Sequence, residues 1–278
     1  MKRALLLLVC ALVALCFTFY ILEINVTDVF TYSNGGSVKP ETELSKKEQS
    51  SYEPPVPLRI NGWTLVWADD FDGPSLNMEH WSEVDRKNSY NNELQYYSPL
   101  NSYVRKGRLY LTAKKEKKEG KRYTSAMVET KDKLSINAGK IEIRAKMPSG
   151  QGLFPAIWLL SHNGDFEIDI MEMIGSEPDA IYGVNHYYSD GVLAKSYEMI
   201  RKDGTDGFHV YTLEWEKDEL RWYMDGELYH QTKRGVPDEE MYLIFTLAVG
   251  GDWPGSPTDD KIFPCSMVVD YVKLYQRI

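Results

Sequence analysis

Short segments in which apolar and polar residues alternate recur along the chain from about residue 58 onward. Each is only five to nine residues long, which is typical of strands with one buried face. The segments predicted as strands are 63–67, 109–113, 140–146, 210–215, 220–224 and 267–275. Asp225-Gly226 predicts a tight hairpin, and Lys106-Gly107 predicts a turn before the second segment. Because no long segment with helical periodicity follows residue 58, the pattern predicts antiparallel sheets packed as a sandwich or jelly roll.

The first 57 residues follow a different pattern. Lys2 and Arg3 precede an uncharged, largely apolar run, 4–22, which is long enough to cross a bilayer. The run ends without an Ala-x-Ala cleavage site, which favours an uncleaved signal anchor over a cleaved signal peptide. Its N-terminal positive charges favour an outward-facing remainder. We therefore expect residues 1–22 to be a membrane anchor or signal sequence and the polar residues 23–57 to be a flexible linker.

Both interpretations of the first segment place residues 58–278 outside the cell. The domain is expected on the extracellular face of the cell membrane, or secreted if the segment is cleaved. Two weaker alternatives are lipidation at Cys16 and a buried core helix.

Composition narrows the classes of partner. Apolar residues make up 43% of the chain and aromatic residues 13%, which supplies a large core and excludes global disorder. The chain has a net charge of −9, and 27 basic against 35 acidic side chains follow residue 57, so a nucleic-acid partner is not expected. Cys265 is the only cysteine after the apolar run, which excludes a disulfide framework and a thiolate zinc site.

The segment Asp165–Gly175 (DFEIDIMEMIG) concentrates acidic residues within an apolar stretch. In a regular strand Glu167 and Asp169 point to one face, whereas Glu172 is out of phase and points among apolar side chains. A β-bulge near Ile170 would return Glu172 to the acidic face. Three carboxylates on one strand face repel one another, so the arrangement indicates a chemical role.

Clustered carboxylates have more than one use. Hydrolysis of a glycosidic bond needs one ionised carboxylate as nucleophile or base and one protonated carboxyl as acid. Asp169, between the two Glu residues, could hold the nucleophile and raise the pKa of the acid. Calcium binding is an alternative, although calcium ligands usually lie in loops. A solvated strand face is disfavoured by the apolar flanks, and a carbohydrate-binding domain without catalysis would not need the trio.

With this motif, the chain resembles glycoside hydrolase family 16 and its laminarinase-like branch, whose Glu-x-Asp-x-x-Glu motif has the same bulged spacing. The further matching segments are WTLVWADDFDG (63–73), NNELQYY (91–97), GKIEIRAKMP (139–148), PAIWLL (155–160), VYTLEWEKDELRWYMDG (210–226), LAVGGDWPGSP (247–257) and DYVKLYQ (270–276). The resemblance covers nearly all of 60–278. It implies an all-β, concanavalin-like jelly-roll sandwich of two antiparallel sheets with a substrate cleft across the concave sheet.

The resemblance also implies an activity and its residues. The expected reaction is retaining cleavage inside β-1,3-linked glucan chains, with Glu167 as nucleophile, Glu172 as acid/base and Asp169 as assisting residue. Four further residues match positions that line the family's cleft, where aromatic side chains suit the apolar faces of glucose rings. These expected substrate contacts are Asn92, Trp158, His186 and Trp253. Three other tryptophans are left open between core and cleft wall: Trp67, Trp215 and Trp222.

Members of the family often hold a structural calcium ion on the convex side. The corresponding ligands here are Asp70, the main-chain carbonyl of Gly107, and Asp270. No cofactor is expected for the chemistry, and the catalytic domain is expected to be monomeric. Phe154 and Phe166 depart from the residues common in the family at the cleft border. Mixed-linkage β-1,3-1,4-glucan hydrolysis, agar or carrageenan cleavage and wall-polysaccharide transglycosylation therefore stay open as alternatives.

Overall fold

The computed structural model of the protein describes residues 59–277. The predicted anchor (1–22) and linker (23–57) lie outside the described residues. Helical structure within 59–277 is limited to two short 3-10 helices, Pro99–Asn101 and Asp260–Ile262. No helix in that range is long and apolar enough to span a bilayer. Strands make up most of the regular structure, as the alternating pattern predicts.

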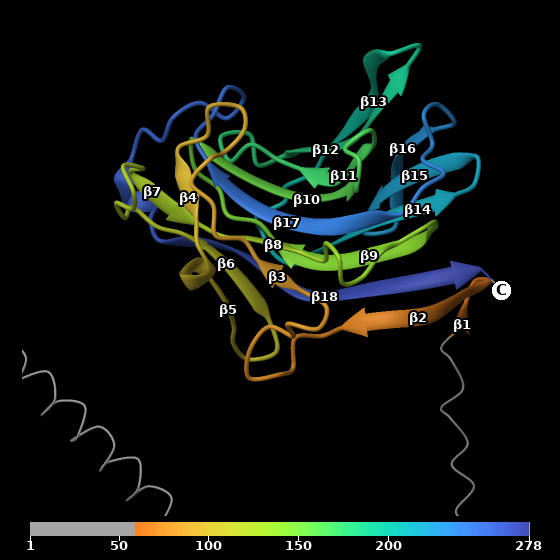
Figure 1. Cartoon of the computed structure of the whole chain (residues 1–278), viewed down its shortest axis with the longest axis horizontal. Coiled ribbons are helices and arrows are strands. Elements are labelled where there is room, and N and C mark those ends of the chain that lie inside the picture. The colour runs from red at the N-terminus through yellow and green to blue at the C-terminus, as the bar shows by residue number, and fades with distance from the viewer. Residues whose placement is uncertain (1–58, 278) are drawn as a thin grey trace, which may run out of the picture. The chain divides into compact units, whose positions relative to one another are not determined.

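The strands form two large antiparallel sheets and one small parallel pair (Figure 1). The nine-stranded sheet contains, in spatial order, β1 (Arg59–Ile60), β2 (Trp63–Asp69), β18 (Cys265–Arg277), β9 (Gly139–Lys146), β14 (His209–Glu216), β15 (Glu219–Met224) and β16 (Glu227–Thr232), with β6 (Leu109–Ala113) pairing β18 and β5 (Ser102–Val104). The seven-stranded sheet contains, in order, β13 (Val192–Arg201), β12 (Ala180–Ser189), β11 (Glu167–Glu172), β10 (Leu153–Ser161), β17 (Met241–Val249), β8 (Met127–Glu129) and β3 (Ser82–Glu83). The parallel pair is β4 (Gln95–Tyr97) with β7 (Tyr123–Ser125).

Every segment predicted as a strand is a strand, and the all-β sandwich is confirmed. Both turn signals are confirmed as well. Asp225 and Gly226 have φ of +51° and +82° and join β15 to β16, and Lys106 and Gly107 have φ of +53° and +66° between β5 and β6. Backbone twist of this kind suits a tight hairpin, and glycine adopts it without steric cost.

The main core lies between the two large sheets. Alternate residues of β9, such as Ile141 and Ile143, are fully buried there and face buried residues of the other sheet, such as Ile157 and Phe245. Two of the tryptophans left open by the sequence, Trp215 and Trp222, belong to this core. A second, smaller apolar cluster lies on the outward face of the seven-stranded sheet: Tyr97, Met127, Tyr242 and Ile244, with Val84, Trp158 and Leu160 packed against them.

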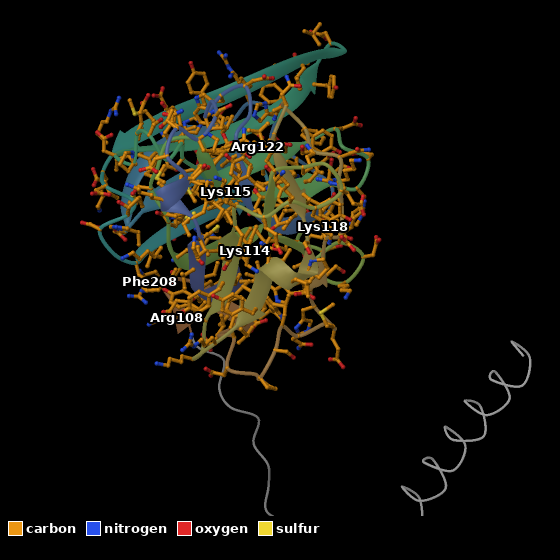
Figure 2. The ribbon with its side chains drawn as sticks, turned by 90° about the vertical axis from the view of Figure 1, so that its left-hand side faces the viewer. Arg108, Lys114, Lys115, Lys118, Arg122 and Phe208 are labelled. Carbon is orange, nitrogen blue, oxygen red and sulfur yellow. The ribbon has the colours of Figure 1, made fainter. Side chains whose placement is uncertain are left out.

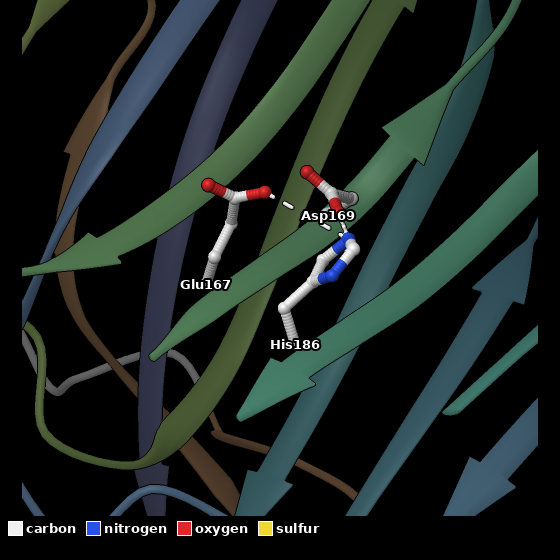
Figure 3. Close-up of side chains that lie close together, drawn as sticks. All are labelled: Glu167, Asp169 and His186. Carbon is white, nitrogen blue, oxygen red and sulfur yellow. Dashed lines mark ion pairs between the residues drawn. The ribbon is translucent and has the colours of Figure 1, made fainter. Parts of the chain in front are cut away.

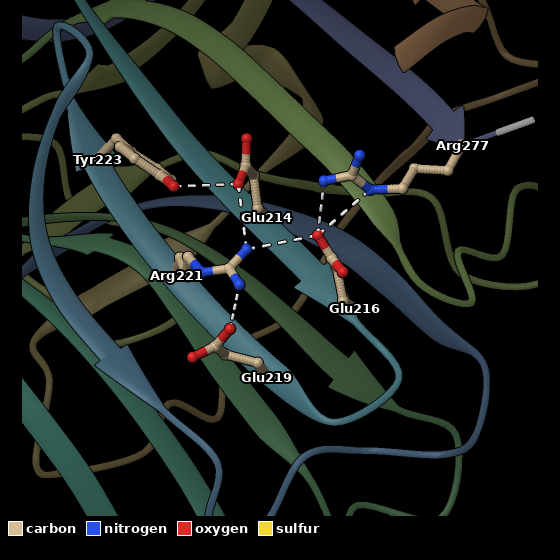
Figure 4. A network of polar contacts seen from close by, with 6 residues as sticks. All are labelled: Glu214, Glu216, Glu219, Arg221, Tyr223 and Arg277. Atoms are coloured by element: carbon tan, nitrogen blue, oxygen red, sulfur yellow. Dashed lines mark hydrogen bonds and ion pairs between the residues drawn. The ribbon is translucent and has the colours of Figure 1, made fainter. Parts of the chain in front are cut away.

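The outward face of the nine-stranded sheet carries a polar network (Figure 4). The guanidinium of Arg221 pairs with Glu219 and lies 3.3 Å from Glu216 and 3.5 Å from Glu214. The hydroxyl of Tyr223 donates a hydrogen bond of 3.0 Å to Glu214. Each acidic side chain in this network therefore has a cationic partner.

A depression of about 520 Å³ lies on the same face. Its carboxylates are engaged, because Glu142 lies 3.4 Å from Lys140 and accepts a 3.0 Å hydrogen bond from Tyr271, and Glu214 belongs to the network just described. The acids of the seven-stranded sheet are held differently.

Candidate active site

The acidic segment forms β11, in the middle of the seven-stranded sheet, and the predicted bulge is present. Asp169 pairs with Val184 and Glu172 pairs with Tyr182, so three steps along β11 match only two steps along β12. The extra residue lies at the Ile170 and Met171 positions, both of which are buried in the main core. The bulge therefore places Glu167, Asp169 and Glu172 on one face of the strand.

That face is the outward face of the seven-stranded sheet, which we call the active face. On β10, Leu160, Trp158 and Ala156 lie opposite Glu167, Asp169 and Glu172, respectively. Trp158 and Leu160 also pack against the second apolar cluster, which lies outside the main core. The active face is thus a sheet surface with three acids at its centre and an apolar floor on one side.

The bulge is held from the core side by a residue that sequence reasoning left unassigned. The indole nitrogen of Trp222 donates a 2.9 Å hydrogen bond to the main-chain carbonyl of Asp169. Trp222 reaches this position because Gly183 on β12 has no side chain: a Cβ there would lie 2.7 Å from the Trp222 ring. The tryptophan fills the space and binds the backbone that the bulge leaves irregular.

His186 completes the centre of the site (Figure 3). It lies opposite Glu167 on β12, and its Nε2 atom is 3.8 Å from Glu167 Oε1 and 3.5 Å from Asp169 Oδ2. The Asp169 side chain is 3% exposed, and its Oδ2 atom has no hydrogen-bond partner within the described residues. The Glu167 side chain is 37% exposed and can meet a ligand.

The three carboxyls are electrostatically linked. Burial raises the pKa of Asp169 well above its ordinary range, and the charge of Glu167 raises it further. Burial also raises the pKa of Glu172 strongly, followed by the charges of Asp169 and Glu167, while His186 and Lys195 oppose the shift. The pKa of Glu167 is raised by burial and lowered by His186. One ionised and one protonated carboxyl near neutral pH is the combination that acid/base catalysis uses.

One atom each of Glu167, Asp169 and His186 lies within 4.8 Å of the others, close enough to consider a shared cation. Metal ligation requires deprotonated carboxylates. Burial instead favours the neutral carboxyl at Asp169, so this group of residues fits proton transfer better than metal binding.

The predicted substrate contacts lie at and beside this centre. Trp158 is opposite Asp169 and half-buried, and Trp253 is 43% exposed. The ring of Trp253 packs edge-on against Phe154 and Tyr182, with centroid distances of 5.3 and 5.2 Å. Because Tyr182 lies opposite Glu172, Trp253 lies near the carboxyl predicted to act as acid/base.

Asn92 has a supporting position. Its amide donates a 2.8 Å hydrogen bond to the carboxylate of Asp252, and the main-chain nitrogen of Asp252 donates to the carbonyl of Asn91. Asn92 therefore ties its own loop to the loop that carries Trp253.

Sequence reasoning did not identify Tyr182 or Lys195 as parts of the site. Lys195 lies opposite His186 on the neighbouring strand β13, and its charge acts on Glu172. Tyr197, two residues further, is 54% exposed, and the Lys195 ammonium lies 4.9 Å from its ring centroid. Only strand register brings these residues to the active face, so no local motif could have indicated them.

Of the three predicted calcium ligands, Asp270 is already engaged with other side chains. A Cβ added at Gly107 would lie 4.0 Å from the main-chain oxygen of Asp70, so these two residues are neighbours, and their role as calcium ligands stays a prediction. Both carboxylate oxygens of Asp270, however, are paired with guanidinium groups: Oδ1 with Arg108 at 2.8 Å and Oδ2 with Arg144 at 2.5 Å.

The two arginines also share an aromatic partner. Each places its guanidinium carbon over the Phe208 ring, at 4.7 Å for Arg108 and 4.6 Å for Arg144, and Figure 2 shows Arg108 beside Phe208. Two cations already neutralise Asp270, so this carboxylate is a poor ligand for a third. Asp270 is therefore an ion-pair partner of two arginines, and these contacts do not support the prediction that it binds calcium.

Comparison with known proteins agrees with this geometry. Residues 89–273 match the model of the glycosyl hydrolases family 16. A beta-glucanase of Rhodothermus marinus is 38% identical over 78% of this chain and 86% of its own length. The laminarinase catalytic domain of Thermotoga maritima is 36% identical, with a TM-score of 0.71 over 78% of this chain and 99% of the domain. A structure described with endo-acting O-glycanases of the human gut microbiota has a TM-score of 0.75 at 29% identity, over 80% and 94% of the two chains. The chain therefore belongs to glycosyl hydrolase family 16.

Proposed function

We propose that this glycoside hydrolase cleaves β-1,3-linked glucans within the chain and with retention of anomeric configuration. The observation that carries the proposal is the bulged strand β11, which places Glu167, Asp169 and Glu172 on one face with no lysine or arginine ion pair among the described residues. The relatives described as a beta-glucanase and a laminarinase support this substrate class.

The residues divide the reaction between them. Ionised Glu167 attacks the anomeric carbon while protonated Glu172 donates its proton to the leaving oxygen, giving a covalent glycosyl-enzyme. Glu172, now ionised, then removes a proton from water, which attacks the same carbon and releases Glu167. Asp169 lies beside Glu167 on the same strand face and, when charged, keeps the pKa of Glu172 high. This chemistry needs no cofactor.

Retention is proposed because the chain carries the bulged Glu-x-Asp-x-x-Glu motif of a family for which retaining cleavage is expected. The anomer that forms first tests it directly. Proton NMR of laminarin hydrolysis by the full chain should show the β-anomer first. Early accumulation of the α-anomer would refute the double displacement and the nucleophile assignment. Glu167→Gln and Glu172→Gln should each lower kcat by roughly 10²- to 10⁴-fold, the usual effect of losing such a group.

The linkage preference is tested with a panel of β-1,3-, mixed-linkage β-1,3-1,4- and β-1,4-glucans, with mucin O-glycans included because of the likeness to the O-glycanase structure. Fastest cleavage of laminarin supports the proposal. Preference for any other member, or formation of longer products by transglycosylation, would contradict it.

The place of action is also a proposal. The uncharged run 4–22 after Lys2 and Arg3 supports an anchor that holds the enzyme on the extracellular face of the membrane, where a monomeric domain meets polysaccharide. Full-length protein should stay with membranes after a high-salt wash. A mature chain that begins after residue 22 would indicate secretion instead.

A further inference from the structure

An arginine on the active face, far from the catalytic carboxyls, has no counterpart in the mechanism. Arg86 follows β3 and is bound through its backbone to Tyr97, with hydrogen bonds of 2.9 and 3.0 Å in the two directions. Its Nη2 atom lies 3.6 Å from the sulfur of Met127, which belongs to the second apolar cluster together with Trp158. The guanidinium therefore lies on the same face of the sheet as Glu167 and Glu172.

The guanidinium is held in place but incompletely paired. Its carbon atom lies 5.2 Å from the ring centroid of Tyr90 and 5.8 Å from that of Tyr97, so two aromatic rings fix its plane. The Nε atom is buried and has no hydrogen-bond partner, and no carboxylate oxygen of residues 59–277 is within 4.0 Å of the group. Because Nε is buried, the Nη atoms are the donors that can meet a ligand.

Arg86 lies too far from the catalytic carboxyls to act on the scissile bond, but it is placed to contact another part of a long substrate. Across the sheet, β8 is three strands from β11, and strands lie about 4.8 Å apart, so Arg86 lies roughly 14 Å or more from the catalytic strand. A glucan that crosses the strands would reach it with an outer sugar unit. Tyr90, which is 67% exposed beside it, offers an aromatic face to the same unit.

We propose that Arg86 and Tyr90 form an outer binding site for a neutral sugar unit of the glucan, in which the guanidinium donates to sugar oxygens and the Tyr90 ring packs against the sugar. This inference rests on the proposed glucanase function. It assigns to two residues of this chain a preference for long substrates.

The surrounding charges favour a neutral ligand over an anionic one. Arg86 acts on both Glu93 and Glu129, whose pKa values burial raises and Arg86 lowers, so both carboxyls lie within its electrostatic reach. An anionic substituent bound at Arg86 would meet these two groups whenever they are ionised. A hydroxyl accepts from the guanidinium and can also pair with a carboxyl in either protonation state.

The test is a length series of neutral laminari-oligosaccharides, from short to long, with kcat and KM measured for the full chain and for Arg86→Met. The variant keeps a flexible apolar stem and loses the donors, the charge and the stacking on Tyr90 and Tyr97. The expected result is an unchanged kcat/KM for short members and a roughly 10- to 100-fold higher KM for long ones, the size of a lost charged hydrogen bond. Arg86→Lys should recover only part of the loss, and Tyr90→Ala should resemble Arg86→Met.

Arg277→Met is the matched control, because Arg277 also stacks on an aromatic ring, Trp63 at 4.5 Å, but lies on the nine-stranded sheet. It should leave the length dependence unchanged. Tm of Arg86→Met is measured alongside, because the variant removes the unpaired Nε donor and also the contacts of the guanidinium with Tyr90, Tyr97 and Met127.

The outcomes separate this inference from the proposed function. The outer site alone would be overturned if KM depended on oligosaccharide length in the same way in Arg86→Met and in the unchanged protein. A fall in Tm without a change in KM would overturn it as well. Failure of the unchanged protein to cleave the series at any length would overturn the proposed function, and the outer site with it.

Discussion

At the scale of single residues, the site depends on which carboxyl holds a proton. Asp169 is almost fully buried and touches only His186 among the cationic side chains within 59–277. Its negative charge raises the pKa of Glu172 and is itself opposed by burial. The protonation states of Glu167, Asp169 and Glu172 therefore depend on one another, and a pH–activity curve reports the three together rather than any single residue.

Replacing Asp169 with Asn should move the alkaline limb of the pH–kcat/KM curve to lower pH. The Asn side chain keeps the shape of Asp169 but removes a charge that raises the pKa of Glu172, so Glu172 loses its proton earlier. Initial rates on laminarin across a pH series measure the shift. An alkaline limb that stays in place, or moves upward, would contradict the electrostatic role of Asp169.

Replacing Glu172 with Gln should make the protein more stable at neutral pH while lowering its activity. The pKa of Glu172 is raised above its ordinary 4.5 in the folded state, so folded protein holds a proton that unfolded protein has lost. Stability is therefore lost as pH rises above about 4.5, and the neutral Gln side chain avoids that loss. Thermal unfolding at several pH values measures it: the Tm difference should be positive at neutral pH and vanish near pH 4. A lower Tm for the variant at neutral pH would show that Glu172 stabilises the fold.

At the scale of elements, β11 shows what a sequence can and cannot predict. The bulge is predictable because Glu172 is out of phase with the other two acids, and only an extra residue puts it on their face. The support of the bulge is not predictable, because Trp222 is 53 residues from Asp169 in the sequence and meets it only when the two sheets pack. Lys195 and Arg86 likewise reach the active face through strand pairing and not through a local motif.

Trp222→Phe isolates the support of β11 from its packing. Phe keeps an aromatic ring in the core but cannot donate to the Asp169 carbonyl, so that buried acceptor loses its partner at a cost of about 1–3 kcal/mol. The free energy of unfolding should fall by that amount. Because the lost bond holds the backbone between Glu167 and Glu172, kcat should fall more than KM rises.

Trp215→Phe is the control. Its indole donates to the carbonyl of Pro237, away from β11, so the variant should lower stability with little change in kcat. Similar kcat losses in both variants would mean that Trp222 acts through general stability only.

At the scale of the whole molecule, the two sheets have separate tasks. The seven-stranded sheet carries acids without cationic side-chain partners other than His186, whereas the nine-stranded sheet pairs its acids with arginine and lysine on its outward face. The alternating pattern predicts both sheets, but it does not distinguish a carboxylate with a partner from one without. Asp270 illustrates this: its partners Arg108 and Arg144 are 162 and 126 residues away, so the sequence indicated a calcium ligand where the fold forms an ion pair.

The ion pairs of Asp270 with Arg108 and Arg144 predict that its charge stabilises the fold without calcium, whereas a calcium ligand would stabilise it only with the ion bound. Burial alone would raise the pKa of Asp270, but the hydrogen bonds from Arg108 and Arg144 lower it below its ordinary 3.8. A carboxyl with a lowered pKa in the folded state stabilises the protein above about pH 4. This stabilisation disappears as the pH falls through the pKa that the carboxyl has in the folded state.

Asp270→Asn should therefore lower the free energy of unfolding at neutral pH by about 1–2 kcal/mol, a moderate value because the arginines are partly exposed and water screens the pairs. The difference should shrink below pH 4, where the unchanged protein loses the same charge. Calcium and a chelator should leave Tm unaltered in both proteins, whereas added salt should lower the Tm difference by screening the ion pairs. A calcium-dependent rise in Tm that Asp270→Asn abolishes would show that the carboxylate leaves its two arginines to bind the ion.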